Sequence, residues 1–361
     1  MRIELPFPLT LGRIRQAVGA SGAADDATTI TAITTDTRKL RPHDLYVALH
    51  GRRDDGHRYL TAAVSGGAAA LVTEMPTERG ISVLNTHAAL LDIARLSLTE
   101  HRIPVIAITG SVGKTGTKDA VAAALSPRFS VHKTRENENN ELGIAKTVLS
   151  RNVNDTLLVL ELGSNHPGEI APLSRCISPD VAIITAIGSA HIGAFGTKEA
   201  ILREKASITD GMRGGHLLLP ASDPYLSTLS LSLPILTVAT EGEADFLAEG
   251  IYFSRFGTSY TLKTASGRQR VFLRGVGRPR ILSSLFAMAA AHTLGVPLSS
   301  AAAALLRLPY AEGRGSVCEV GGVLLIDDAY NSSPEAVAEG LVYIKFEQNY
   351  AKKLSKHGKM K

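Results

Sequence analysis

The stretch Ile-Ala-Ile-Thr-Gly-Ser-Val-Gly-Lys-Thr, residues 106–115, determines the fold class of this chain. An apolar run typical of a buried strand is followed by a glycine loop and by Gly-Lys-Thr, where a helix over 114–125 is predicted. Backbone N–H groups made accessible by glycine, the Lys114 ammonium and the positive end of the helix all favour a bound phosphate. The Thr115 hydroxyl can bind Mg²⁺ beside it. The predicted nucleotide-phosphate site consists of Gly110, Ser111, Gly113, Lys114, Thr115 and Gly116.

The loop is shorter than the common form of this motif. Two residues lie between Gly110 and Gly113, whereas the widespread form has four residues between its first glycine and Gly-Lys. A glycine turn with a chance Gly-Lys-Thr would have the same sequence. The other motifs of the chain are therefore needed to distinguish a phosphate-binding loop from a chance glycine turn.

The composition describes a globular protein with more than one domain. The chain has 361 residues, 44% of them hydrophobic and 20% charged. No apolar run is long enough to cross a bilayer, and no signal pattern opens the chain. The net charge of +5 resides in residues 345–361, which hold six lysines and one glutamate, so a nucleic-acid-binding face is not expected. Cys176 and Cys318 form no metal or redox motif, which fits a reducing cytoplasm.

The pattern of apolar segments divides the chain into three regions of mixed α/β character. Residues 1–98 predict a small α/β domain. Residues 99–311 predict one large domain, in which near-continuous apolar strands alternate with helices; this is typical of a mostly parallel sheet covered on both faces. Residues 312–361 contain one strand, one helix and a lysine-rich tail. The expected strands are 44–49, 69–72, 105–109, 156–161, 181–186, 216–219, 235–238 and 323–327, and the expected helices include 11–18, 59–65 and 334–341.

Four further polar features belong to the large domain, whose ligands should bind beyond the carboxyl ends of its strands. Residues 137–143 form an amide-rich loop that can donate and accept hydrogen bonds, although a polar helix cap has the same composition. Glu161 ends a buried strand, where a carboxylate needs a cation, and is a candidate Mg²⁺ ligand. His191 follows the next strand, and Lys205 lies on a helix predicted over 198–209. Taken alone, these two would be a structural histidine and a surface lysine.

In this order the motifs resemble those of the Mur ligases, over about residues 30–340. Besides the P-loop, the resemblance includes residues 137–143, 161–170 and 190–205. The pattern Leu-Ile-Asp-Asp-Ala-Tyr-Asn-Ser-Ser-Pro at 325–334 is similar to the MurF branch rather than the MurE branch. MurF enzymes join D-alanyl-D-alanine to a UDP-N-acetylmuramoyl tripeptide in peptidoglycan synthesis.

The resemblance implies a role for each candidate residue. Lys114 and Thr115 would hold the ATP phosphates and one Mg²⁺, and Glu161 and His191 would coordinate Mg²⁺ near the substrate carboxylate. Lys205 matches a lysine that carries a carbamate in several Mur ligases, an anion able to bind a second Mg²⁺. The implied reaction converts a carboxylate into an acyl phosphate, which an amine turns into an amide with release of ADP. The resemblance also assigns Arg314, Asp328 and Asn331 to the nucleotide.

The first region resembles the UDP-binding domain of MurE and MurF, through residues 35–38, 45–51 and 55–57. The resemblance implies that hydroxyl, guanidinium and backbone donors surround a diphosphate. A surface turn with an ion-paired arginine is the alternative. The implied substrate contacts are Thr37, Arg38, Asp55, Gly56, His57, Asn137, Asn139 and Asn140.

Several positions depart from the family pattern. Gly116 stands where a second Thr or Ser is usual, and Glu136 replaces a glycine. Pro279, Arg280 and Ser283 stand where the family has His and Asn residues that face adenine, so an altered purine affinity or orientation is expected. A helix is still expected over 284–294.

The last region resembles only the opening of the third, Rossmann-like domain of the family. One strand and one helix cannot bury a Rossmann core, so we expect an incomplete domain and weak or absent ligase activity of the 361-residue chain. A MurF-type ligase and a nucleotide- and UDP-sugar-binding protein without catalysis both remain open. A MurE-like or folylpolyglutamate synthase-like ligase is a further alternative. We expect a cytoplasmic monomer with no nucleic-acid partner and no membrane insertion.

Overall fold

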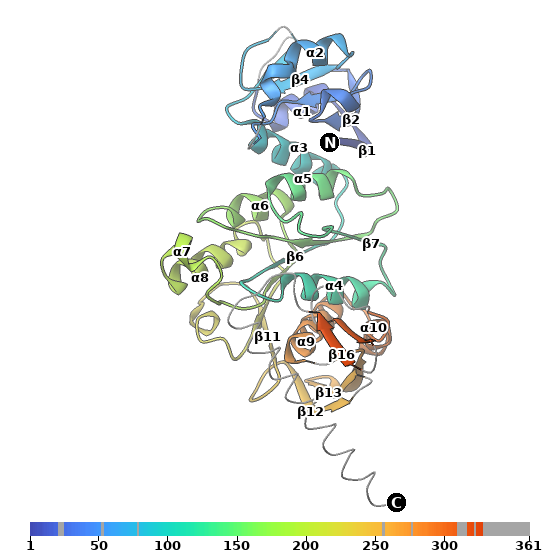
Figure 1. Cartoon of the computed structure of the whole chain (residues 1–361), viewed down its shortest axis with the longest axis vertical. Helices are drawn as coiled ribbons and strands as arrows, with labels where there is room; N and C mark the ends of the chain where they lie inside the picture. Colours follow the sequence, from blue (N-terminus) through green and yellow to red (C-terminus); the bar gives the residue numbers. More distant parts are fainter. Residues whose placement is uncertain are drawn as a thin grey trace, which may run out of the picture.

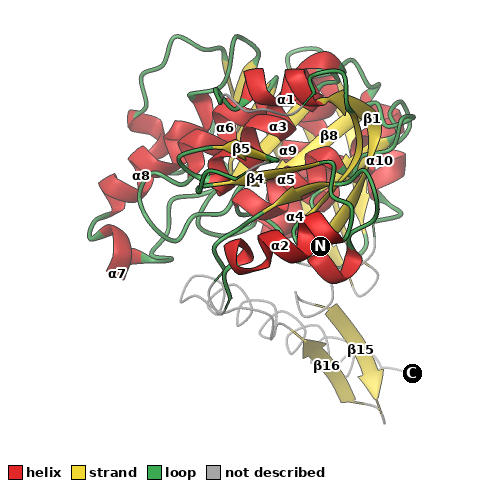
Figure 2. Cartoon of the chain, turned by 90° about the horizontal axis from the view of Figure 1, so that it is seen from above, coloured by secondary structure: helices red, strands yellow, loops and turns green. Residues whose placement is uncertain are grey.

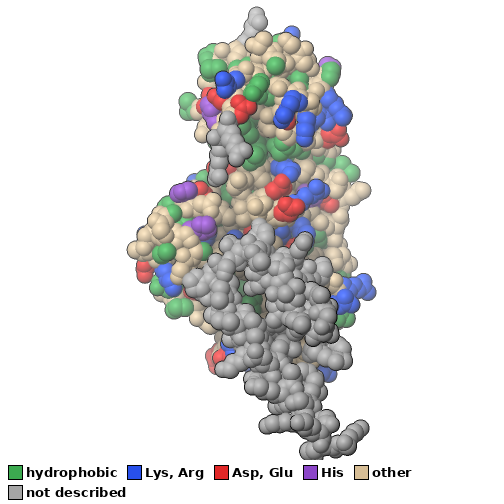
Figure 3. All heavy atoms as spheres, viewed as in Figure 1, with side chains coloured by type: hydrophobic (Ala, Val, Ile, Leu, Met, Phe, Trp, Pro, Cys, Tyr) green, Lys and Arg blue, Asp and Glu red, His purple; other side chains and the backbone are tan. Residues whose placement is uncertain are grey.

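Two β-sheets divide the chain into an N-terminal lobe and a larger central lobe, stacked along the long axis of the molecule (Figure 1). The computed structural model describes residues 1–20, 25–51, 54–77, 79–254, 257–275, 277–308, 316–320 and 323–327. The face shown in Figure 3 narrows between the lobes, and its Lys and Arg side chains are interspersed with Asp and Glu. In the described part of the chain, no helix is both long and apolar enough to cross a membrane.

The N-terminal lobe contains a five-stranded sheet in the order β1-β2-β3-β4-β5. The β1–β2 pair is antiparallel and the other pairs are parallel. The predicted segments 11–18, 44–49, 59–65 and 69–72 all correspond to observed elements, whereas β1 and α3 were not expected. The elements are β1 (Arg2–Thr10), α1 (Leu11–Ala17), β2 (Thr29–Thr34), η1 (Thr37–Lys39), β3 (Leu45–Val47), η2 (Gly56–Tyr59), α2 (Leu60–Ser65), β4 (Ala70–Thr73), β5 (Gly80–Ser82) and α3 (Thr86–Glu100).

The central lobe is built on a nine-stranded sheet in the order β14-β13-β12-β11-β10-β9-β6-β8-β7. All strand pairs from β7 to β12 are parallel, as predicted, because apolar strands alternate with crossover helices there. The pairs β12–β13 and β13–β14 are antiparallel and were not predicted. The strands are β6 (Val105–Thr109), β7 (Val131–Lys133), β8 (Leu157–Glu161), β9 (Val181–Ile184), β10 (His216–Pro220), β11 (Ile235–Ala239), β12 (Phe246–Ser254), β13 (Gly257–Thr264) and β14 (Gly267–Leu273).

Helices cover both faces of this sheet. Side chains of β6 alternate between two hydrophobic clusters: Ala107 belongs to the cluster shared with α3, α5 and α6, and Ile106 and Ile108 to the cluster shared with α4, α9 and α10. The helix expected over 284–294 begins earlier, at Arg278, because Gly277 and Pro279 form a start signal there. The helices are α4 (Lys114–Leu125), α5 (Glu141–Leu149), α6 (Ile170–Ile177), α7 (Ile192–Phe195), α8 (Lys198–Ala206), α9 (Arg278–Thr293) and α10 (Leu298–Leu305), with 3-10 turns η3 (Ser207–Thr209) and η4 (Leu226–Thr228).

The two lobes share buried structure at their junction. Helix α3 packs against α5 and α6 within one hydrophobic cluster that includes residues of both sheets. The side chain of Arg151 is fully buried there; its Nη2 donates to the carbonyls of Ser97 (3.0 Å) and His101 (2.8 Å) at the end of α3. Its guanidinium also lies 5.3 Å from the ring centre of Phe7 in β1. One side chain thus connects the end of α5 to two elements of the N-terminal lobe.

A two-stranded hairpin, β15 (Ser316–Val320) and β16 (Val323–Asp327), follows the central lobe. It overlaps α9 and α10 in Figure 1 but lies apart from the body in Figure 2, so it projects from the central lobe. The strand predicted at 323–327 is present. The helix predicted at 334–341 and the residues Arg314, Asp328 and Asn331 lie outside the described residues.

Candidate active site

The phosphate-binding loop lies between β6 and α4, at the carboxyl edge of the central sheet, where open α/β sheets bind ligands. Gly110 and Gly113 adopt φ values of 140° and 82°, which favour glycine, and Gly113 is the N-cap of α4. The Lys114 ammonium donates to the carbonyl of Gly110 at 2.8 Å, so in this structure it folds back over the loop. The backbone N–H of Ser111 is bound to the Ala186 carbonyl (2.9 Å), which ties the loop to the segment after β9.

Close packing explains why Gly110 has no side chain. A Cβ atom at this position would overlap Thr185 Oγ1 and would lie 3.0 Å from the Thr185 nitrogen. Gly116, in the first turn of α4, has more room, because the nearest atom to a Cβ placed there would be Ser283 Oγ at 3.4 Å. The loop geometry therefore depends on Gly110 far more than on Gly116.

The carboxylate of Glu161 lies at the end of β8 and is buried, with 2% of the residue exposed. Its Oε2 accepts a hydrogen bond from the Thr115 hydroxyl at 2.8 Å, and its Oε1 accepts one from Asn139 Nδ2 at 3.0 Å. A buried carboxylate beside a hydroxyl and an amide is an oxygen-rich donor set, which suits Mg²⁺. The side chains present at this edge therefore fit the ion that the P-loop implies.

Sequence reasoning missed the buried lysine Lys118, which lies beside Glu161. Lys118 is 2% exposed, and its Nζ lies 3.9 Å from Glu161 Oε2 and 4.0 Å from Asp119 Oδ1. It follows Thr115 by about one helical turn and so projects from the same side of α4. A lysine at that spacing in a helix behind Gly-Lys-Thr is the signal that could have identified it.

Lys205 is buried in α8, whereas its position in the sequence, taken alone, favoured a surface residue. Its Nζ lies 2.7 Å from Ser164 Oγ, three positions after Glu161 in the chain, and the residue is 3% exposed. Burial, and then the charge of Lys114, lower the pKa of Lys205 to about 8, although Glu204 and Glu169 act in the opposite direction. The neighbouring Glu204 carboxylate accepts from the backbone N–H groups of residues 168–170, at 2.6–3.0 Å, and so holds the start of α6.

His191 precedes α7 and adopts a left-handed conformation, with φ of 60°. It is exposed, and partial burial together with the charges of Lys205 and Lys114 lowers the pKa of its imidazole. The charge of Lys114 thus lowers the pKa of both His191 and Lys205. Thr115, next to Lys114, is hydrogen-bonded to Glu161. The structure places the four side chains predicted to be catalytic around one edge of the sheet: Lys114, Glu161, His191 and Lys205.

The three asparagines of the amide-rich loop, Asn137, Asn139 and Asn140, lie in different surroundings. Asn139 contacts Glu161, and its carbonyl accepts the backbone N–H of Gly163 at 2.8 Å. Asn140 is the N-cap of α5, and its side chain accepts from the backbone N–H of Gly143 at 3.0 Å. Asn137 is exposed. The polar-cap alternative therefore holds for Asn140, whereas Asn139 faces the candidate site.

In the N-terminal lobe, Arg38 forms the ion-paired surface turn that was the alternative to a phosphate contact. Its side chain is 86% exposed and binds Asp36 through Nε (2.8 Å) and Nη2 (3.0 Å). The guanidinium hydrogen bond lowers the pKa of Asp36 to about 2. Thr37 begins the 3-10 turn beside it. A diphosphate contact by Arg38 would require it to exchange this carboxylate for the ligand.

The loop of Asp55, Gly56 and His57 is held by internal hydrogen bonds. Asp55 caps η2, and its Oδ1 accepts from both the backbone N–H (3.0 Å) and the Nδ1 (2.8 Å) of His57. These bonds lower the pKa of Asp55. His57 is buried, and its Nε2 accepts the backbone N–H of Glu74 at 3.1 Å. Both ring nitrogens and the backbone N–H of His57 are therefore engaged by groups of the protein.

The start of α9 lies beside the start of α4. Thr117 Oγ1 donates to Ser283 Oγ at 3.2 Å in buried surroundings, and the two helices pack closely. Arg278 pairs with Glu241 at 2.8 Å. The segment with Pro279 and Arg280 therefore adjoins the phosphate loop, and the altered purine affinity or orientation expected from these residues stays a prediction.

The P-loop at the carboxyl edge of a parallel sheet, with a buried carboxylate on the adjacent strand, defines a nucleotide-binding α/β protein. Two family models match it: the catalytic domain of the Mur ligase family over residues 29–137, and the Mur ligase middle domain over residues 108–291. The chain belongs to the Mur ligase family.

Relatives and solved structures agree with this assignment. The chain is 33% identical to the UDP-N-acetylmuramoyl-tripeptide–D-alanyl-D-alanine ligase of Bacillus subtilis, over 93% of this chain and 74% of the relative. It is 32% identical to the enzyme of the same name from Escherichia coli, over 84% and 70%. A crystal structure of MurF from Acinetobacter baumannii superimposes with a TM-score of 0.85 at 31% identity, over 93% and 76%. A MurF ligase from Thermotoga maritima in complex with ADP gives 0.80 at 30% identity, over 85% and 73%.

Proposed function

We propose that the protein is an ATP-dependent amide ligase that adds D-alanyl-D-alanine to UDP-N-acetylmuramoyl-tripeptide. The names of the relatives support this substrate pair. The observation that carries the proposal is the hydrogen bond between Thr115 of the P-loop and the buried carboxylate of Glu161. It joins a phosphate-binding element to a metal-binding carboxylate, as transfer of a phosphoryl group requires.

Each residue at this edge has a proposed task. The Lys114 ammonium, which leaves the Gly110 carbonyl, binds the ATP phosphates. The backbone N–H groups of residues 110–116 bind them too, except that of Ser111, which is bonded to Ala186. The side chains of Thr115, Glu161 and His191 hold Mg²⁺, which when bound neutralises charge on the transferring group. Arg314, Asp328 and Asn331 are proposed nucleotide contacts. Asn137, Asn139 and Asn140, with Thr37, Arg38, Asp55, Gly56 and His57, are the proposed contacts of the UDP-linked substrate.

Lys205 is proposed to carry a carbamate. Its lowered pKa, about 8, keeps part of the side chain as a neutral amine near neutral pH. That amine forms an N–C bond to CO₂ and releases one proton, which leaves an anion beside Ser164. The modified Lys205 would be a metal ligand close to Glu161.

The chemistry follows from positioning. A carboxylate is a poor electrophile, so its oxygen attacks the γ-phosphorus of ATP, the bond to ADP breaks, and an acyl phosphate forms. The amine of D-alanyl-D-alanine then attacks the acyl carbon, loses a proton and displaces phosphate. Lys114 stabilises the negative charge that moves during the first step, and no covalent bond to the protein is needed.

The test is release of ADP by the purified protein. Release should require UDP-N-acetylmuramoyl-tripeptide, D-alanyl-D-alanine and Mg²⁺ together, and Lys114→Met should abolish it. Binding of ATP and of the UDP-linked substrate without turnover would instead support the binding-only alternative. Turnover with a single amino acid in place of the dipeptide would support a MurE-like or folylpolyglutamate synthase-like ligase.

We propose residues 1–98 as the UDP-substrate domain, 99–311 as the ATP-binding ligase domain and 312–361 as the start of a third domain with its lysine-rich tail. We propose a cytoplasmic monomer with no nucleic-acid partner and no membrane insertion. Sedimentation of the purified protein tests the oligomeric state.

A further inference from the structure

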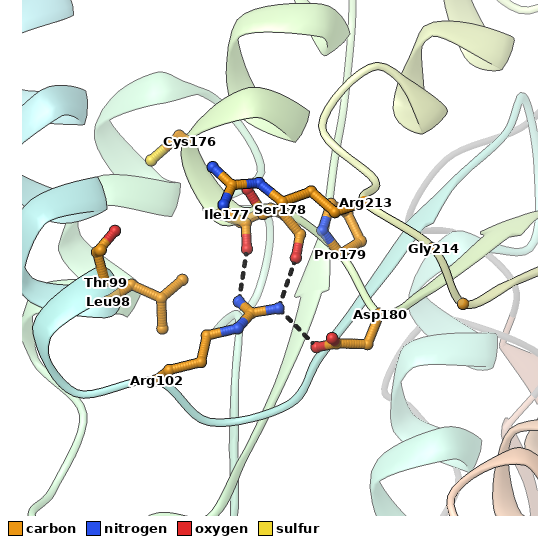
Figure 4. Close-up of a pocket in the computed structure, with 11 residues that line it drawn as sticks. Leu98, Thr99, Arg102, Cys176, Ile177, Ser178, Pro179, Asp180, Arg213 and Gly214 are labelled. Atoms are coloured by element: carbon orange, nitrogen blue, oxygen red, sulfur yellow. Dashed lines mark hydrogen bonds and ion pairs between the residues drawn. The ribbon is translucent and has the colours of Figure 1, made fainter.

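The cavity lined by the ends of α3 and α6 is held by internal bonds. It has a volume of about 460 Å³ and lies at the amino ends of the central strands (Figure 4). Arg102 in its wall donates to the carbonyls of Ile177 (3.1 Å) and Ser178 (2.8 Å). Arg102 also donates to Asp180 Oδ2 at 2.8 Å, and the same oxygen accepts the backbone N–H of Val105 at 2.8 Å. These charged groups bind one another and connect α3 to α6 and β6, which is a structural role.

A different cluster, of histidine and carboxylate side chains, lies at the carboxyl edge of the N-terminal sheet. His50 follows β3 and Glu74 follows β4, which are neighbouring parallel strands, and His57 belongs to η2. Each of these three residues offers one ligand atom within 4.8 Å of the ligand atoms of the other two. The P-loop belongs to the other sheet, so the cluster is separate from the candidate active site.

The separation of His50 and Glu74 is that of two ligands of one metal ion. His50 Nε2 lies 3.1 Å from Glu74 Oε2. Zn²⁺ binds nitrogen and oxygen atoms at about 2.0–2.2 Å in tetrahedral geometry, which places two ligands about 3.3 Å apart. The other separations in the cluster, 4.8 Å at most, have to shorten by up to about 1.5 Å. The side chains of His50 and Glu74 are 53% and 26% exposed, so an ion can reach them from solvent.

Asp55 lies where it can hold the imidazole protons on the far side of both rings. Its Oδ1 accepts from His57 Nδ1 at 2.8 Å and lies 3.2 Å from His50 Nδ1. A neutral imidazole has one N–H, and when that proton is on Nδ1 the Nε2 atom carries a lone pair. His57 uses this lone pair to accept the backbone N–H of Glu74 at 3.1 Å, a bond that it would exchange for the ion. A carboxylate in this outer position is typical of metal-binding histidines, because it orients the ring.

We propose that His50, His57 and Glu74 bind a Zn²⁺ ion, with water as the fourth ligand. Imidazole nitrogen suits Zn²⁺, whereas Mg²⁺ prefers an all-oxygen set. Glu74 Oε1 also accepts the backbone N–H of Thr86 at 2.9 Å, at the start of α3. The ion therefore connects the loop after β3 and η2 to the end of β4 and the start of α3, and stabilises the N-terminal lobe. This site does not depend on the proposed ligase activity.

The experiment titrates the purified full chain with Zn²⁺ in a calorimeter near neutral pH, without nucleotide or UDP-linked substrate. Mg²⁺ is present in large excess, because it fills oxygen-rich sites and competes poorly for imidazole. We expect a saturable site whose apparent Kd rises at least tenfold in His50→Asn and in Glu74→Gln. The amide of Glu74→Gln keeps an oxygen for the Thr86 N–H, so the start of α3 is preserved.

His43→Asn is the matched control, because it removes an exposed histidine of the same lobe. Asparagine tolerates the φ of 70° at residue 43, and Zn²⁺ binding should not change. As a second measurement, Zn²⁺ should raise the unfolding temperature of the unaltered protein and of His43→Asn, but not that of His50→Asn.

The proposal is overturned if the unaltered protein has no saturable Zn²⁺ site, or if either His50→Asn or Glu74→Gln binds Zn²⁺ as the unaltered protein does. A proton shared by His50 and Glu74 would then account for their contact. Because ATP and both ligase substrates are absent, failure here is distinct from failure of the ligase assay.

Discussion

The Thr115 hydroxyl donates a 2.8 Å hydrogen bond to Glu161 Oε2, and this bond joins the first turn of α4 to the end of β8. Asn139 holds the other oxygen of the same carboxylate, so Glu161 has a fixed orientation before any ligand binds. Fixed orientation lowers the cost of ordering the site when metal and nucleotide arrive.

Glu161→Gln should therefore impair Mg²⁺ use. The amide keeps the size of the side chain but loses its charge, so we expect turnover to fall by about 100-fold or more and the Mg²⁺ requirement to rise by about tenfold or more. ADP release measured against Mg²⁺ concentration checks this. Glu243→Gln, at an exposed position, is the control. An unchanged Mg²⁺ dependence in Glu161→Gln would remove Glu161 from the metal site.

Gly110→Ala should damage the phosphate loop. The added Cβ overlaps Thr185 Oγ1 and must also adopt a φ of 140°, so we expect a loss of about 1–3 kcal/mol or more in the free energy of unfolding. ATP binding should weaken with it. Gly193→Ala is the matched control, because nothing lies within 4 Å of a Cβ there. Urea unfolding and ATP titration measure both effects; equal behaviour of the two variants would contradict the prediction.

The buried amine of Lys205 should make stability depend on pH. Its pKa is about 8 in the folded state and 10.5 in its unperturbed form, so the unfolded chain binds more protons between these values and stability rises with pH there. Relative to Lys205→Met, the unaltered protein should gain on the order of 3 kcal/mol as pH rises from 8 to 10.5. Urea unfolding in CO₂-free buffer measures the difference, with Lys39→Met at an exposed position as the control. A difference that does not vary with pH would show that Lys205 is not buried as a free amine.

Arg151→Met should weaken the junction of the lobes. The carbonyls of Ser97 and His101 lose their donor in buried surroundings, at a cost of about 2–4 kcal/mol in the free energy of unfolding. Removal of a buried cation offsets part of this loss, because burial lowers the pKa of Arg151. Denaturant unfolding is the measurement, and Arg307→Met is the exposed control. Stability equal to that of the control would mean that the junction does not depend on Arg151.

The P-loop and the parallel strands around it were predictable because their signals are local. Glycine spacing defines the loop at 110–113, and continuous apolar runs define strands such as β6 and β9. Strands β12–β14 were missed, since one face of this antiparallel extension is partly exposed and its apolar pattern is weak.

Burial of charged side chains was the other limit. Lys118 and Lys205 look like surface lysines in the sequence, because only the packing of α4 and α8 against the sheet removes them from water. Arg38 illustrates the same limit: its exposed guanidinium binds Asp36 in this structure, and the motif alone did not decide between this pairing and a ligand contact. Pairings of this kind depend on rotamers and neighbours, which a linear pattern does not encode.

The two ends of the central sheet have a consequence for behaviour at high concentration. Exposed edge strands can pair with another chain and start aggregation. At one end, β7 has three residues and finishes in Lys133; at the other, β14 carries Arg268 and Arg270. Neither edge strand is both long and uncharged, so neither favours pairing with a strand of a second molecule. We therefore expect these edges to disfavour fibre formation by strand addition.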